Sequence, residues 1–160
     1  MRLYFLPYCL LFWVGLSAQD TLIRIDGVVN FQLDPLGQLV YQDVSGRLLR
    51  RDLAADTLYV FDDNLLGDIT YVDVSNPFGP LLYFEDFDLV LLLDRTLNEV
   101  GRLDYRSSEV ISSSKAVARN FDNRIWLFDQ GDFRLKLLDS EGSVRQQSDD
   151  LRRLLGLYNP

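Results

Sequence analysis

Hydrophobic and polar positions alternate along short segments of this chain, and turn residues interrupt the segments at close intervals. In residues 124–128, isoleucine and leucine fall on one side of an extended chain, while Trp126 and Phe128 fall on the other, as in a β-strand. Residues 89–93 are apolar throughout, which is typical of a strand covered on both faces. The β-branched and aromatic residues, without a helical period, favour strands over helices.

This pattern predicts an all-β chain in which three successive groups of four strands are separated by turns rich in Asp, Asn, Pro and Gly. An additional strand is predicted at residues 21–25, before the first group. The predicted strands are residues 28–33, 38–42, 47–51 and 57–61 in the first group, 69–74, 81–85, 89–93 and 99–103 in the second, and 115–119, 124–128, 133–138 and 143–147 in the third.

The three groups repeat at a fixed spacing. An aspartate closes the aromatic-rich strand of each group, and 43 residues separate Asp43 from Asp86 and Asp86 from Asp129. A constant period of this size is a signature of repeated supersecondary units, and propeller blades repeat at about 40 to 50 residues. The third unit shows the plan most clearly, in the apolar strands, aspartates and turns of residues 116–118, 121–129, 133–135, 138–139 and 141–142.

The third unit resembles the β-propeller superfamily, and most closely the six-bladed NHL-like and TolB-like secreted propellers. The resemblance implies four-stranded antiparallel blades at about residues 26–68, 69–111 and 112–154. Propeller rings have about four to eight blades, so this chain alone does not close a ring. Either the chain is part of a longer propeller, or two chains close a six-bladed ring head to tail. An open arc and a β-sandwich are further alternatives.

The flank of the third unit is expected to expose apolar surface. Residues 150–157 are largely apolar at the point where a fourth blade would begin. Unpaired sheet edges and large apolar patches promote association. We therefore expect self-association through this blade edge as one interaction of the chain.

Residues 1–18 have the layout of a secretory signal peptide, with Arg2 first, an apolar run next, and the small residues Ser17 and Ala18 last. The apolar run is shorter than the roughly 20 residues that a transmembrane helix needs. We expect cleavage after Ala18, a mature domain of residues 19–160 and no membrane span, an uncleaved anchor being the alternative. The expected location is secreted or periplasmic, including association with the outer membrane.

The charge and the composition of the chain limit the partners and the kinds of active site that we expect. The formal net charge is −8, which argues against a nucleic-acid partner, because nucleic-acid binding depends on cationic side chains. The chain has no His, and its one cysteine, Cys9, lies in the expected signal peptide. Catalytic dyads and metal sites built on His or Cys are therefore not expected in the mature chain.

Acidic turns are the first candidate sites. The Asp-rich turns at residues 62–64, 85–88 and 149–150 contain the oxygen ligands that Ca²⁺ takes. Aspartate is also common in turns because its side chain bonds the local backbone, and this structural interpretation is favoured. The aspartates of the 43-residue period recur in every unit, which favours a structural role over a single catalytic one. Hydrolysis by paired carboxylates stays open, because sequence does not give their separation.

Ser112 and Lys115 have the Ser-x-x-Lys spacing of a serine nucleophile activated by lysine. That chemistry places the two side chains one turn apart on a helix, whereas this segment leads into a predicted strand. A polar connection between blades is the favoured interpretation. Trp126, Tyr83 and Tyr41 hold equivalent or adjacent places in the three units, and we expect them in the core between blades rather than in a sugar-stacking platform.

Arginines alternate with aspartates along the predicted strands. Ion pairs between strands at the outer blade edges are the expected arrangement. An arginine that faces the central channel is the sharper alternative, because a guanidinium group can bind a carboxylate or phosphate through two parallel hydrogen bonds. The arginines concerned are Arg47, Arg50, Arg51, Arg102, Arg106, Arg119, Arg124, Arg134, Arg152 and Arg153.

The function predicted from these observations is a non-enzymatic binding or scaffold module of the cell envelope, with a protein or peptide partner on the face formed by the blade loops. No catalytic, cofactor-binding or metal-binding residue is assigned, and no cofactor is expected. The alternative is part of a propeller hydrolase of the lactonase or glycan-hydrolase type, because six-bladed propellers of this resemblance include such enzymes. Acidic and Asn residues converging on one end of the channel would favour that alternative.

Overall fold

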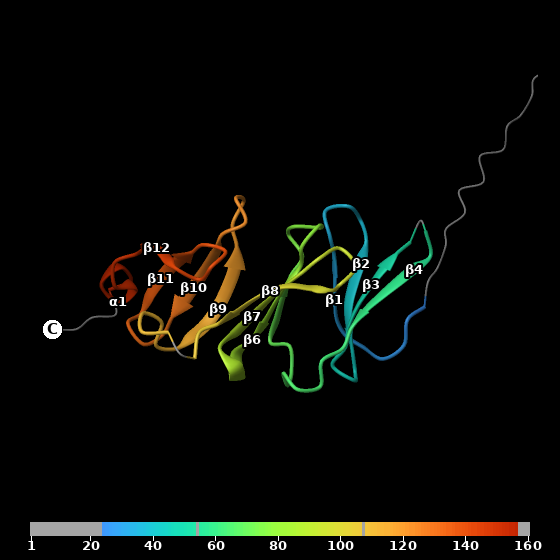
Figure 1. Cartoon of the computed structure of the whole chain (residues 1–160), viewed down its shortest axis with the longest axis horizontal. Coiled ribbons are helices and arrows are strands. Elements are labelled where there is room, and N and C mark those ends of the chain that lie inside the picture. The colour runs from blue at the N-terminus through green and yellow to red at the C-terminus, as the bar shows by residue number, and fades with distance from the viewer. Residues whose placement is uncertain (1–23, 54, 107, 157–160) are drawn as a thin grey trace, which may run out of the picture.

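The computed structural model describes residues 24–53, 55–106 and 108–156, which form three antiparallel four-stranded sheets placed side by side (Figure 1). In each sheet, strands that follow one another in the chain pair with one another. We name the sheets blades 1, 2 and 3. Blade 1 contains β1 (Val28–Leu33), β2 (Leu39–Asp43), β3 (Leu48–Asp52) and β4 (Thr57–Phe61); blade 2 contains β5 (Tyr71–Asp73), β6 (Leu81–Phe84), β7 (Leu89–Leu93) and β8 (Glu99–Asp104); blade 3 contains β9 (Ser114–Arg119), β10 (Ile125–Asp129), β11 (Arg134–Leu138) and β12 (Val144–Gln147).

The twelve strands predicted in three groups are confirmed, with ends that shift by one or two residues. The additional strand predicted at residues 21–25 is wrong at Arg24 and Ile25, which form no strand. Its other residues, like the predicted signal peptide at residues 1–18, lie outside the described residues. The apolar segment after β12 begins with a short helix, α1 (Leu151–Leu154), which Asp150 caps by accepting a hydrogen bond from the Arg152 amide.

The first strands of the three blades lie along one edge of the stack. The side-chain amide of Gln32 in β1 donates to the carbonyl of Val72 in β5. The amide of Arg119 in β9 donates to the carboxylate of Asp73 in β5. These two bonds join neighbouring blades through their first strands, which we call the first-strand edge.

The two ends of the stack differ in the loops that they carry (Figure 1). The β1–β2, β5–β6 and β9–β10 loops emerge at the end drawn at the top, which we call the hairpin end. The opposite end, which we call the η1 end, carries the 3₁₀ helix η1 (Glu85–Phe87) and the connections from one blade to the next. The antiparallel order of the strands dictates this division, because alternate loops of a meander fall on opposite ends.

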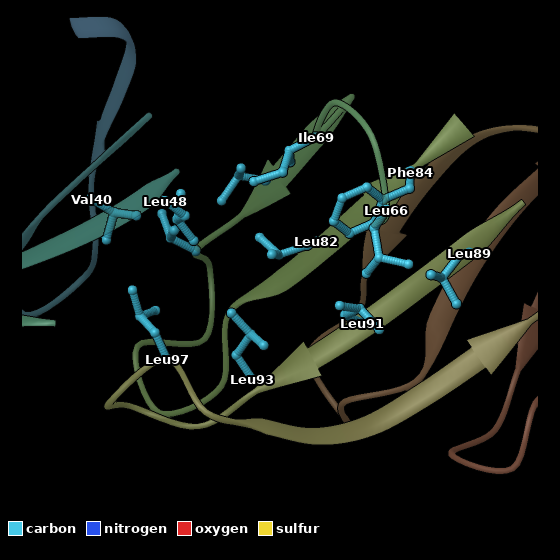
Figure 2. Packing of buried hydrophobic residues seen from close by; sticks show 12 residues of the cluster. Val40, Leu48, Leu66, Ile69, Leu82, Phe84, Leu89, Leu91, Leu93 and Leu97 are labelled. Atoms are coloured by element: carbon cyan, nitrogen blue, oxygen red, sulfur yellow. The ribbon is translucent and has the colours of Figure 1, made fainter. Parts of the chain in front are cut away.

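The core between blades 1 and 2 is aliphatic and aromatic (Figure 2). Val40 and Leu48 of blade 1 pack in one cluster with Phe84, Leu91 and Leu93 of blade 2, and each of these side chains is at most 2% exposed. The register explains the grouping, since residues paired across strands share a face. Removing a leucine side chain from such a core costs about 2–5 kcal/mol.

The opposite face of blade 2 packs against blade 3. Tyr83 and Val90 lie in a second cluster with Val117, Ile125 and Leu127 of blade 3. Alternate residues of β7 therefore face different neighbours, which explains why that strand is apolar throughout. The predicted alternation of residues 124–128 is confirmed, because the isoleucine and leucine are buried while Trp126 and Phe128 are only half-buried.

Five hairpin turns share one local structure. An Asp or Asn side chain accepts hydrogen bonds from the amides two and four residues later, and the residue between those amides has a positive φ of 63° to 82°. The side chain thereby satisfies the amides of the turn, which is the ordinary reason for Asp and Asn at such positions. The five residues are Asp34, Asp43, Asp94, Asn120 and Asp139.

Candidate binding groove at the hairpin end

Each hairpin that joins the first and second strands of a blade carries an exposed apolar side chain near its tip. Leu36 of blade 1 is 59% exposed, Phe78 of blade 2 is 62% exposed and Phe121 of blade 3 is 98% exposed. The backbone of each loop is ordered by turn hydrogen bonds in which the apolar side chain takes no part. Three apolar tips therefore stand at one end of the stack without a packing role there.

A groove of about 350 Å³ lies between two of these loops, β5–β6 and β9–β10. The side-chain amide of Asn76 donates to the side-chain oxygen of Asn123 over 2.8 Å, so the two loops are bonded across the groove. A pocket of this size falls in the range that holds small ligands or part of a peptide. Its lining residues are Ser75, Asn76, Pro77, Arg119, Asn120, Phe121 and Asn123.

Arg119 supplies the positive charge of the groove, at the end of β9. Its backbone is fixed by the bond to Asp73, and its guanidinium lies under the β5–β6 loop, 3.2 Å from where a Cβ at Gly79 would stand. Glycine at that position therefore leaves room for the guanidinium against the loop backbone. The Nε of Arg119 is buried and has no hydrogen-bond partner among the described residues.

Burial lowers the pKa of Arg119, and the nearby Asp73 carboxylate acts in the opposite direction. Arginine stays protonated in proteins even so, so the lowered pKa marks a charge that has lost water. A desolvated cation whose Nε lacks a partner gains more from an anionic ligand than a fully hydrated cation does.

Most arginines pair with an acidic residue close in sequence. Arg47 pairs with Asp43, Arg124 with Asp122 and Arg145 with Asp139. The expectation of pairing between strands at outer edges is thus replaced by pairing within turns. Arg50 departs further, because it is 2% exposed and forms a buried ion pair of 2.6 Å with Asp34.

Arg119 lies at the end of a first strand and lines the groove at the hairpin end. The three described blades do not close a ring, so the alternative of an arginine facing a central channel stays a prediction. The sequence offered Arg119 only as one member of a long series of arginines. Only the fold distinguishes Arg119 from the other arginines, because Gly79 and the two hairpin loops enclose its guanidinium.

At the η1 end a buried lysine forms ion pairs with two aspartates. Lys136 is 3% exposed, and its ammonium lies 2.6 Å from a carboxylate oxygen of Asp129 and 2.8 Å from one of Asp132. Burial alone would raise the pKa of Asp129, but hydrogen bonds from Lys136 and from the amides of Ser112, Ser113 and Gly131 outweigh it and hold the pKa below its usual value. Burial likewise opposes the charge of Lys136, and its bonds to the two carboxylates prevail and raise its pKa.

A second polar chain joins blades 2 and 3 at this end. The backbone amide and hydroxyl of Ser114 both donate to Asp88, and the Tyr83 hydroxyl bonds the Ser114 oxygen over 2.9 Å. Burial raises the pKa of Tyr83 to about 12, so the phenol keeps its proton and donates. Lys115 pairs with Glu85 across the same junction.

These contacts show what the Ser-x-x-Lys residues and the repeated aspartates do in the structure. The ammonium of Lys115 is held by Glu85, and the segment that contains Ser112 and Lys115 is not helical. Asp43 and Asp129 close their strands and bond local amides, as the structural interpretation predicts. Asp86 does not share that role, because β6 ends at Phe84 and Asp86 is exposed in η1.

Two of the acidic turns bond the local backbone, as the structural interpretation predicts. Asp63 accepts from the Leu65 amide and Asp150 caps α1, whereas Asp88 accepts from Ser114 of blade 3. Among residues 24–53, 55–106 and 108–156, no group of three or more acidic residues is arranged to hold a metal ion. In the same residues, no helix is long and apolar enough to cross a membrane.

Of the three aromatic residues, only Tyr83 has the predicted place between blades, where it is 1% exposed. Tyr41 is 7% exposed and Trp126 is half-buried, but neither lies between two described blades, so for these two residues the expectation stays a prediction. Phe31 pairs with Tyr41 on the face of blade 1 that points away from blade 2, and Trp126 lies on the face of blade 3 that points away from blade 2. The repeat places them at junctions that need further blades.

The comparisons with known proteins place the fold. No protein family matches the sequence, and no curated protein matches it. Among solved structures, the chain is similar to a streptogramin B lyase (TM-score 0.56, 11% identity, 77% of this chain and 40% of that chain) and to apo AztD from Citrobacter koseri (0.56, 12%, 84% and 38%). It is also similar to the WD40 β-propeller domain of Doa1 (0.54, 12%, 76% and 40%).

The chain thus has a β-propeller-type fold of four-stranded blades, and the predicted fold class is confirmed. It spans about 40% of the length of the streptogramin B lyase and of the Doa1 domain. Because the identities are 11% and 12%, the likeness concerns the fold and does not extend to activity.

Proposed function

We propose that this protein is a non-enzymatic binding module that takes a protein or peptide partner at the hairpin end. The observation that carries the proposal is the set of three exposed apolar tips, Leu36, Phe78 and Phe121, on equivalent loops of three blades. Apolar side chains in a polar surround are typical of interaction surfaces. The groove beside Arg119 adds a polar contact next to two of these tips.

The η1 end, by contrast with the hairpin end, also supports binding at the hairpin end. Its polar side chains Asp129, Lys136, Asp88 and Ser114 are bonded to one another, so they stabilise the junction of blades 2 and 3. The signal peptide expected from residues 1–18 supports a partner in the periplasm or outside the cell, at the envelope. The acidic net charge of −8 disfavours nucleic acid.

The proposal also includes self-association of the blades. Phe31, Leu33, Leu58 and Val60 lie on the face of blade 1 that points away from blade 2, and each is between 45% and 68% exposed. The segment that follows blade 3 also exposes apolar side chains, because Leu154 and Leu155 are 65% and 66% exposed.

A second copy placed head to tail would cover both outward faces. By the 43-residue repeat, Trp126 on blade 3 corresponds to Tyr83, and Tyr41 on blade 1 corresponds to Phe84; in the described stack Tyr83 faces blade 3 and Phe84 faces blade 1. Blade 3 of one copy and blade 1 of another therefore offer the two halves of the same kind of junction. Sedimentation of the full chain should show a dimer that Phe31→Glu dissociates, whereas a monomeric wild-type chain would contradict the second copy as the occupant.

The binding proposal is tested by cross-linked capture from envelope extract with three forms of the full chain. The wild type should retain a stoichiometric partner that the Phe78→Ser/Phe121→Ser double variant loses. Leu65→Ser is the matched control, because Leu65 is 86% exposed in the connection between β4 and β5, away from the hairpin loops, and it should retain the partner. Equal retention by all three forms, or no stoichiometric partner with the wild type, would contradict the proposal.

A further inference from the structure

We propose that the groove at Arg119 binds a carboxylate group of a peptide segment whose neighbouring residues are apolar. This inference rests on the proposed function and specifies which chemistry the binding surface recognises. The carboxylate would lie against the guanidinium of Arg119, between the β5–β6 and β9–β10 loops.

The guanidinium of Arg119 is not satisfied by the described residues around it. Among the described residues it forms no ion pair, in contrast to Arg124 on the next loop, which pairs with Asp122. Its Nε is buried without a partner, and an unsatisfied buried polar group is costly. A carboxylate in the groove would neutralise this desolvated cation and accept from the terminal nitrogens of the guanidinium, because the Nε itself is buried.

The charge of the surroundings favours a carboxylate over a phosphate. Asp73 is 7% exposed, and its carboxylate lies close enough to act on the pKa of Arg119 in the direction opposite to burial, although burial lowers this pKa on balance. The chain as a whole has a net charge of −8. A dianion would meet more repulsion at such a site than a monoanion, which one guanidinium can neutralise.

The walls of the groove favour a peptide with apolar neighbours. Pro77 and Phe121 line it, and Phe78 stands on the same loop as Pro77. The Asn76–Asn123 hydrogen bond holds the two loops together before a ligand arrives, which lowers the entropic cost of binding. The carboxylate can come from the end of a chain or from an Asp or Glu side chain.

The test uses three short peptides and the full ¹⁵N-labelled chain. The first is acetyl-Ala-Ala-Leu-Phe with a free terminal carboxylate, the second is its amide, and the third is an amide in which Glu replaces the second Ala. NMR follows the Nε–Hε signal of Arg119, identified by its disappearance in Arg119→Lys. The first or third peptide should shift this signal saturably, and which of them does so identifies the source of the carboxylate.

Two variants make the outcome decisive. Arg119→Lys should weaken the binding of the responding peptide by about tenfold or more, as expected for a lost charge-assisted pair of hydrogen bonds. Arg124→Lys, the control at the far end of the β9–β10 loop, should leave the affinity within about twofold, because Arg124 does not line the groove and an exposed ion pair is worth little. Equal responses to all three peptides, or no response to any, would overturn the carboxylate site.

The proposed function can survive that failure. A partner whose capture depends on Phe78 and Phe121 but is unaffected by Arg119→Lys would show that the hairpin end binds through its apolar tips without a carboxylate contact. A loss of capture in both sets of variants would support the two inferences together.

Discussion

The two ends of the blade stack use charged residues in opposite ways. At the η1 end, Lys136 is enclosed by Asp129 and Asp132, and every one of these charges has an opposite partner. At the hairpin end, the Nε of Arg119 is buried without a partner among the described residues, beside exposed apolar tips. The charges of the Lys136 cluster are paired, although Oδ1 of Asp132 is buried without a hydrogen-bond partner among the described residues, and such a cluster contributes to stability. A cation without an ion pair, next to apolar surface, is available for a ligand. The comparison separates residues that hold the blades together from residues that are free to bind.

The largest expected effect is on stability at the η1 end. Lys136→Met leaves the buried carboxylate of Asp129 without its cation, and the free energy of unfolding should fall by about 3–5 kcal/mol. Urea denaturation of the full chain measures this change. Lys115→Met is the control, because Lys115 pairs with Glu85 at a more exposed site, and its effect should stay below about 1 kcal/mol. Equal losses in the two variants would remove the distinction between a buried and an exposed pair.

The second expected effect is a pH dependence of the difference in unfolding free energy between the wild type and Lys136→Met. Asp129 has a lowered pKa in the folded protein, so its stabilising contribution is present above the unfolded-state pKa of about 3.9 and is lost as the pH falls through the folded-state value. The stability gap between the wild type and Lys136→Met should therefore narrow below about pH 4. Denaturation curves at several acidic pH values measure it, and a constant gap would show that the pair is not coupled to ionisation of Asp129.

The smallest expected effect is on stability at the hairpin end. Arg119→Met replaces a desolvated cation with an apolar side chain of similar length, so the free energy of unfolding should change by less than about 1 kcal/mol. Thermal or urea denaturation alongside Lys136→Met measures both ends in one series. A loss of several kcal/mol in Arg119→Met would mean that Arg119 belongs to the folded scaffold in the way that Lys136 does.

Local sequence patterns predicted the strands because each strand is specified by its own alternation and turns. For the uniformly apolar β7 and the alternating β10, the pattern of apolar residues alone predicted which side chains are buried. The 43-residue repeat predicted the position of a residue less reliably where the loops of the blades differ in structure. Asp86 keeps the 43-residue spacing but lies in η1, because β6 ends two residues before it.

The groove could not be predicted in the same way, because its parts are far apart in sequence. Asn76 and Asn123 are 47 residues apart and meet only when blades 2 and 3 pack. Gly79 matters because it leaves room for the guanidinium of Arg119, a contact between two loops that no local pattern contains. Sequence offered an arginine facing the channel as one alternative, and the fold was needed to single out Arg119.

The central claim is that ligand binding belongs to the hairpin end, and hydrogen–deuterium exchange tests it most directly. The full chain would be compared with and without saturating acetyl-Ala-Ala-Leu-Phe bearing a free carboxylate, or its Glu-containing amide if that peptide responds. Added protection is predicted in the β5–β6 and β9–β10 loops, at residues 74–80 and 119–124, with no change at residues 85–88 of the η1 end. Protection confined to the η1 end would contradict the account.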